Sequence, residues 1–122
     1  MSIKVLELHH HSVRVAPTPQ DVERARAFYV DVLGLSIDPG RVTSSGVPGH
    51  WLNVGEHGQI HLIGIQGNRH DDPNGIDTSE PHVALAVADL TEARADLERR
   101  GIPFRVANAA RGAEHTQLFL RD

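Results

Sequence analysis

Apolar and polar residues alternate in several short segments of the chain, and two longer segments repeat apolar residues at helical spacing. In residues 3–15 the alternation is clearest after His10, and it places His10, Ser12 and Arg14 on one face of a strand. Further strands are predicted at 35–37, 51–54, 59–65, 81–87, 102–106 and 116–120. Helices are predicted over 22–33 and 90–99, with Asp21 and Asp89 as N-caps. This pattern predicts an α+β protein.

The two halves of the pattern repeat one another. The strand of His10, Ser12 and Arg14 matches that of His82, Ala84 and Ala86, and both strands lead into a capped helix. The polar segment 67–80 is rich in turn-forming residues and links module one (1–66) to module two (81–122). The strand at 59–65 has no counterpart in module two. We therefore expect one domain over residues 1–122, built from two βαβββ-like modules, the second short of its last strand.

Composition excludes several classes of function. The 122 residues carry 12 basic and 16 acidic side chains, a net charge of −4, which argues against a nucleic-acid partner. The chain has no cysteine, which excludes a disulfide scaffold, a cysteine-ligated zinc site and a cysteine nucleophile. No apolar run is long enough to span a membrane, and no signal peptide is visible. We expect a cytoplasmic protein without a membrane partner.

Histidine is unusually frequent, with nine residues in the chain. His10 and His82 occupy matching positions in the repeat, and His61 lies in the last strand of module one. Three imidazoles on one concave sheet suit a divalent transition metal with open positions. A lone strand histidine is more often a hydrogen-bonded polar residue, but the repeat favours His10 and His82 as ligands. Strand alternation predicts that His9 and His11 point to the opposite face from His10.

Four segments resemble a known superfamily. They are Leu8-His9-His10 with the strand that follows, the helical segment 21–35, the strand 59–62 and the strand 81–85. Residues 117–122 also resemble the lead-in to an Asp-Pro-Asp-Gly turn. Together, in this order and spacing, they resemble the vicinal oxygen chelate superfamily, which includes glyoxalases, fosfomycin-resistance enzymes, bleomycin-resistance proteins, methylmalonyl-CoA epimerases and extradiol dioxygenases.

The resemblance implies paired βαβββ modules that form a cupped mixed sheet around one metal ion, with helices on the outer face. It implies His10 and His82 as the first ligand of each module and His61 as the last-strand ligand of module one. In the superfamily the last metal ligand, from the last strand of module two, is usually a glutamate, and it has no counterpart within these residues. Glu114 and the terminal carboxylate of Asp122 are candidates to take its place. Metal binding needs neutral imidazoles, so affinity is expected to fall below about pH 6.5.

The leading functional hypothesis is a metal-dependent glyoxalase-like enzyme of the lyase, isomerase or epimerase type. A divalent metal ion (Zn, Ni, Mn, Co or Fe) would chelate a small oxygen-rich substrate and stabilise an oxyanion. Arg14 is on the same face as His10 and is a candidate to hold an anionic substrate, although a surface arginine explains it equally well. Trp51 is a candidate to line the pocket, although a single tryptophan is more often part of the core.

Two alternatives belong to different reaction classes. An Fe(II) extradiol-type dioxygenase would also use imidazoles with open positions, but it requires a carboxylate ligand. A non-catalytic binding protein of the bleomycin-resistance type would lack the full ligand set. In either case a homodimer is expected, because an incomplete sheet edge exposes strand hydrogen bonds and apolar surface that a second chain can cover.

Overall fold

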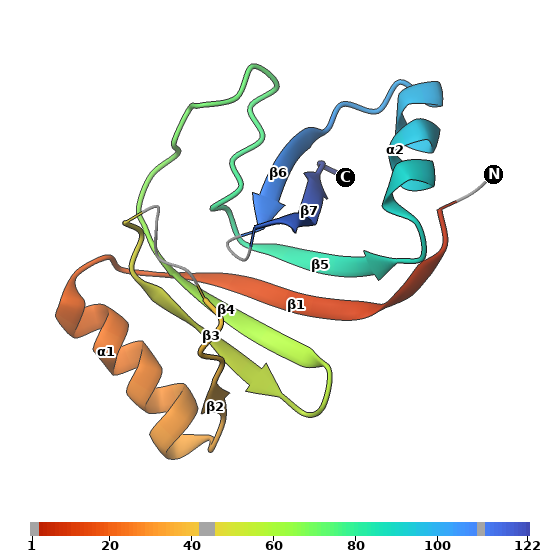
Figure 1. The fold of residues 1–122 in the computed structure, drawn as a ribbon. Helices are drawn as coiled ribbons and strands as arrows, with labels where there is room; N and C mark the ends of the chain where they lie inside the picture. The colour runs from red at the N-terminus through yellow and green to blue at the C-terminus, as the bar shows by residue number, and fades with distance from the viewer. Residues whose placement is uncertain (1–2, 42–45, 110–111) are drawn as a thin grey trace.

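A computed structural model describes residues 3–41, 46–109 and 112–122 (Figure 1). In chain order the elements are β1 (Val5–Val15), α1 (Pro19–Ala27), a π-helical segment η1 (Phe28–Val32), β2 (Ser36–Ile37), β3 (Gly49–Val54), β4 (Gly58–Gly64), β5 (His82–Val87), α2 (Leu90–Arg99), β6 (Arg105–Ala109) and β7 (Gly112–Phe119). No helix among the described residues is long and apolar enough to cross a membrane.

The strands form one mixed sheet of five strands and a separate hairpin. The order in the larger sheet is β2-β3-β4-β1-β5, with β1 and β4 parallel and the other pairs antiparallel. Within the described ranges, β6 and β7 pair only with each other, and they lie beside β5 (Figure 1). In module one, β4 lies between β1 and β3, whereas the described part of module two has no strand in the equivalent place beside β5. The predicted α+β fold is therefore confirmed.

Both helices begin at a side-chain cap, but the first cap differs from the prediction. Thr18 is the N-cap of α1, and its Oγ1 accepts a hydrogen bond from the backbone N–H of Asp21 at 3.2 Å. The predicted cap, Asp21, lies inside the first turn, because Pro19 is favourable at the start of a helix and does not break it. Asp89 caps α2 as predicted, by accepting from the N–H of Glu92.

The two faces of the five-stranded sheet bury different kinds of residue. α1 lies against the face that carries Leu52 and Leu62, both fully buried, and Val22 of the helix is buried there beside Gly64. The opposite face carries polar residues that are also buried, with His10 at 3% and His61 at 7% exposure. An apolar core therefore supports one side of the sheet, and a polar cluster occupies the other.

Truncation of a central core residue is expected to destabilise the fold strongly. Leu62→Ala should lower the free energy of unfolding by about 2–5 kcal/mol, since the cavity lies between the sheet and α1, where neither side collapses easily. Chemical denaturation measures this change. Leu120→Ala is the matched control, because Leu120 is 47% exposed and its truncation should change stability little. Equal losses in the two variants would contradict this description of the core.

Candidate functional site

Five aromatic rings form a row across the polar face of the sheet. Trp51 on β3 stacks on His61 of β4, with ring centroids 4.6 Å apart, and His61 stacks on His10 of β1 at 3.8 Å. His82 of β5 meets His10 edge-on at 5.4 Å and meets Phe119 of β7 at the same distance. Trp51 is directly opposite His61 in the β3–β4 register, which places both side chains on one face. The structure thus brings together the three histidines selected from the sequence.

The hydrogen bonds around His82 determine which nitrogen carries each proton. His82 Nδ1 is 2.6 Å from the carbonyl oxygen of Glu80, which can only accept, so Nδ1 carries the proton and Nε2 is an acceptor. The hydroxyl of Ser12 donates to His82 Nε2 at 3.0 Å, and His10 Nε2–H donates to it at 3.3 Å. His10 Nδ1 then accepts from Nδ1–H of His9 at 2.8 Å. The result is a connected chain of imidazoles.

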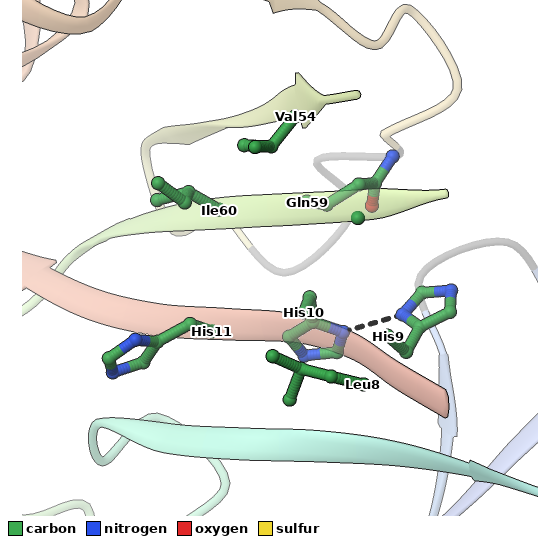
Figure 2. A pocket seen from close by; sticks show the side chains of 8 residues that line it. Leu8, His9, His10, His11, Val54, Gln59 and Ile60 are labelled. Atoms are coloured by element: carbon green, nitrogen blue, oxygen red, sulfur yellow. Dashed lines mark hydrogen bonds between the residues drawn. The ribbon is translucent and has the colours of Figure 1, made fainter. Parts of the chain in front are cut away.

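The position of His9 corrects the expectation from strand alternation. Its ring contacts the ring of His10 instead of pointing to the opposite face, as Figure 2 shows. The β1–β5 register shifts between Leu8 and His10, and such an irregularity interrupts the alternation of side chains. A bulge depends on how two strands pair, so the sequence of β1 alone carried no signal for this contact.

His61 is held by a second polar network. Its Nε2 is 2.8 Å from Oε1 of Gln59, an acceptor, so Nε2 carries the proton and donates. The amide of Gln59 in turn donates to Asp38 Oδ2 at 2.6 Å and to Asn53 Oδ1 at 3.1 Å. Gln59 was not among the predicted site residues. Its position two residues before His61 on one strand, and hence on the same face, is the sequence signal that identifies it.

Burial keeps the central imidazoles neutral. Burial, followed by the charges of the neighbouring His82, His9 and His11, lowers the pKa of His10 from 6.5 to about 3. Burial also lowers the pKa of His61 to about 3, with His10 as the next largest cause. Both rings are therefore uncharged well below pH 6.5, the value at which the sequence alone predicts loss of metal affinity.

The geometry of His10 and His82 fits two ligands of one metal ion. Ligands at about 2.0–2.1 Å from a tetrahedral ion lie about 3.3 Å from each other, and His10 Nε2 and His82 Nε2 are separated by 3.3 Å. The bond from His82 Nδ1–H to a backbone carbonyl is also the usual way in which a ligating histidine is oriented. For Nε2 of His10 to bind an ion, it would have to release its proton. Nδ1 of His10 would then take the proton of His9 Nδ1, and His9 would take a proton from solvent at Nε2.

His61 does not fit as a third ligand in the observed arrangement. Its ring is nearly parallel to that of His10, with 16° between the planes, and metal ions bind in the ring plane. Its Nε2 also donates to Gln59. Among the described side chains, no group of three histidine, aspartate or glutamate residues is arranged to hold a metal ion. Asp122 is exposed, and the side chain of Glu114 lies outside the described residues.

Arg14 is bound to the segment between the modules. Its guanidinium donates to the carbonyl and the hydroxyl of Ser79, both at 3.0 Å, and pairs with Asp77 at 3.4 Å. Burial alone would raise the pKa of Asp77, but hydrogen bonds from Ser79 and from the Arg69 N–H, together with the charge of Arg14, lower it overall. These contacts give Arg14 a structural function, and its binding of a substrate stays a prediction.

Removal of the Arg14 guanidinium is expected to loosen residues 67–80. Arg14→Ala should lower the free energy of unfolding by about 1–3 kcal/mol, because the buried carboxylate of Asp77 loses its cationic partner. Hydrogen exchange across residues 67–80 should increase in the same variant. Arg24→Ala serves as the control, since Arg24 makes an exposed ion pair whose loss costs little. Unchanged exchange in this segment would rule out the anchoring role.

Comparisons with known proteins identify the family. Residues 9–119 match the sequence profile of the Glyoxalase/Bleomycin resistance protein/Dioxygenase superfamily. A solved structure of a hypothetical protein from Bacillus halodurans has a similar fold, with a TM-score of 0.63 and 23% identity over 94% of this chain and 83% of that one. No curated protein matches the chain. The profile spans β1 to β7 and includes all three histidines of the row, so the chain belongs to the Glyoxalase/Bleomycin resistance protein/Dioxygenase superfamily.

Proposed function

We propose that the chain is a metal-dependent glyoxalase-like enzyme of the lyase, isomerase or epimerase type, acting on a small oxygen-rich substrate. One observation carries this proposal: two imidazoles from matching strands place their Nε2 atoms 3.3 Å apart, the separation expected for neighbouring ligands of one ion. His10 and His82 are the proposed ligands. His61 would join them after its bond to Gln59 breaks and its ring turns.

The bound ion would act as a Lewis acid toward adjacent oxygens of the substrate. The surrounding residues of this chain have defined tasks. The Glu80 carbonyl fixes the ring of His82, and Ser12 supplies a hydroxyl that donates into the same space. If Nε2 of His10 became a ligand, Nδ1 of His10 would take the proton that His9 Nδ1 now donates, and His9 would be reprotonated at Nε2. Trp51 stacks against His61 and offers an aromatic ring to the substrate at the end of the row.

A second function is favoured by the aromatic row itself. A non-catalytic binding protein needs a surface for a planar ligand but no complete set of metal ligands. His61 is 7% exposed and is stacked between Trp51 and His10, so a planar ligand would meet the row at the half-buried Trp51. His61 donates its Nε2 proton to Gln59 and needs no metal ion as a partner. In that case the histidines would be structural members of the row.

Metal analysis of the purified chain separates these functions. The protein is stripped with a chelator, dialysed against Zn, Ni, Mn, Co and Fe(II) salts in turn, and the bound metal is measured by mass spectrometry. One metal ion per chain supports the enzyme, and binding of iron alone would favour the dioxygenase alternative. A chain that takes up none of these metals at neutral pH would refute the metal-dependent enzyme and favour the binding protein.

The proposal includes a small-molecule substrate and a homodimer. The described residues leave several large apolar side chains exposed on β1 and β5, including Leu8 at 57% and Val83 at 60%. Contiguous exposed apolar surface is typical of a protein interface. A cytoplasmic location remains a prediction from the sequence.

A further inference from the structure

Residues 67–80 join the two modules and end just before β5, and Figure 1 shows them as a green loop that leaves β4 and returns to β5. Arg14 of β1 ties the end of this loop to the sheet. Its Nε donates to the carbonyl oxygen of Ser79 and its Nη2 donates to the Ser79 hydroxyl, both at 3.0 Å. Ser12 is opposite His82 in the β1–β5 register, so Arg14, two residues further along β1, lies beside the residues that precede β5. Its guanidinium therefore continues the contact between β1 and this segment where the strand pairing ends.

The peptide group that joins Ser79 to Glu80 is held on both sides. Its carbonyl oxygen accepts from Arg14 Nε, and its N–H donates to the carbonyl oxygen of Asp77 at 3.1 Å. Asp77 and Ser79 are buried, with 6% and 4% of their surface exposed, so water does not readily replace these contacts. Because a peptide group is planar, two such bonds fix its orientation.

The next peptide group carries the carbonyl that contacts His82. Glu80 precedes Pro81, so its backbone is restricted to extended conformations, and the proline ring fixes its own φ. With the preceding peptide held by Arg14, few orientations are left for the Glu80 carbonyl. Its oxygen accepts from His82 Nδ1 at 2.6 Å. The position of this oxygen therefore depends on Arg14 through a short and constrained piece of backbone.

The Glu80 carbonyl decides which tautomer His82 adopts. A carbonyl oxygen can only accept, whereas the Ser12 hydroxyl and the ring nitrogen of His10, which face His82 Nε2, can each donate or accept. Among the described residues, no other group that can only accept is bonded to the ring of His82. If the carbonyl moved away, the tautomer with its proton on Nε2 would form hydrogen bonds equally well. That tautomer has no lone pair on Nε2 for a metal ion.

We propose that Arg14 is a positioning residue for His82. By holding the peptide group between Ser79 and Glu80, it keeps the proton of His82 on Nδ1 and leaves Nε2 free to bind a metal ion. The consequence for metal affinity rests on the proposed function, but the consequence for the tautomer needs no metal ion. Arg14 thus acts from module one on the proposed ligand of module two.

The tautomer of His82 is measured with two-bond ¹H–¹⁵N correlation spectra of the ¹⁵N-labelled chain, in the presence of a chelator and at about pH 8, where an ordinary imidazole is neutral. The natural chain should carry the His82 proton on Nδ1 alone. Arg14→Ala should show a mixture of both tautomers. Its affinity for Zn²⁺, measured by competition with a chromogenic chelator, should be at least about tenfold weaker. If Arg14→Ala does not fold, Arg14→Lys is measured instead, because it keeps a cation beside Asp77 but lacks the planar fork.

Arg105→Ala is the matched control, because Arg105 ties the same segment at a different place. It donates to the carboxylate of Asp71 at 2.7 Å and to the carbonyl oxygen of Ile76 at 3.0 Å, several residues before Glu80. Its loss should increase hydrogen exchange around these two contacts, as a looser segment would. The tautomer of His82 and the affinity for Zn²⁺ should stay as in the natural chain.

The spectra separate positioning from a general loosening of the segment. A single Nδ1–H tautomer of His82 in the folded Arg14 variant would overturn the positioning role, and so would an equal mixture in Arg105→Ala. A natural chain that binds no Zn²⁺ would overturn the proposed metal site, and the tautomer in the Arg14 variant would still decide whether Arg14 positions His82.

Discussion

His10→Ala and His82→Ala are each expected to abolish uptake of metal. A site that loses one of its two well-placed imidazoles keeps only one of these ligands, so its affinity for the metal should fall by several orders of magnitude. The measured metal content should therefore fall from one ion per chain to none detectable. His61→Ala should only weaken uptake, because His61 donates to Gln59 and its ring is stacked on His10. Mass spectrometry after dialysis against each metal measures the content.

His57→Ala is the matched control for this series. His57 lies in the turn between β3 and β4 with 75% of its side chain exposed, so its loss should leave the metal content unchanged. Circular dichroism of each variant separates loss of ligand from loss of fold. Normal metal content in a folded His82→Ala variant would exclude His82 as a ligand.

Without metal, the chain is expected to lose stability steeply as the pH falls below 6.5. In the folded chain the pKa values of His10 and His61 are lowered to about 3, and unfolding returns them to 6.5. Between these values the unfolded chain binds the additional protons, so acid favours unfolding. Each histidine lowers the free energy of unfolding by up to about 1.4 kcal/mol for each pH unit below 6.5, and neither changes it above pH 6.5.

Chemical denaturation in the presence of a chelator, from pH 7.5 to 4.5, measures this slope. In the His61→Gln variant the free energy of unfolding should depend less steeply on pH than in the natural chain, by up to about 1.4 kcal/mol per pH unit. The carboxylates are the same in both chains, so the difference isolates His61. Parallel curves for the two chains would show that His61 is accessible to protons in the folded state.

Much of the fold followed from sequence because its signals are local. Alternation of apolar residues identified the strands, and the match between the strands of His10 and His82 indicated two modules. The same match predicted that His10 and His82 lie close together, since these equivalent positions in the repeat were expected to meet at its pseudo-twofold axis. The first cap was assigned to Asp21, whereas Thr18 is the cap and Pro19 is the first helical residue, a position that proline favours.

The details of the site depend on information that no single segment contains. The contact of His9 with His10 arises from an irregular pairing of β1 with β5. The bond from His61 to Gln59 is set by Asp38, which follows β2 and is distant in sequence. Likewise, the alternation that put Arg14 beside His10 could not show that Ser79 and Asp77 would bind its guanidinium.

The central place of β1 in the sheet has a consequence for the order of folding. β1 is made first, but both of its partners, β4 and β5, come much later in the chain, whereas the β3–β4 and β6–β7 hairpins join neighbouring segments. Contacts that close long loops form slowly, so the hairpins should precede the docking of β1. His10 lies on β1 between His61 and His82. The histidine row is therefore assembled only when the chain reaches its final topology, and no folding intermediate that lacks a docked β1 can bind what the finished protein binds.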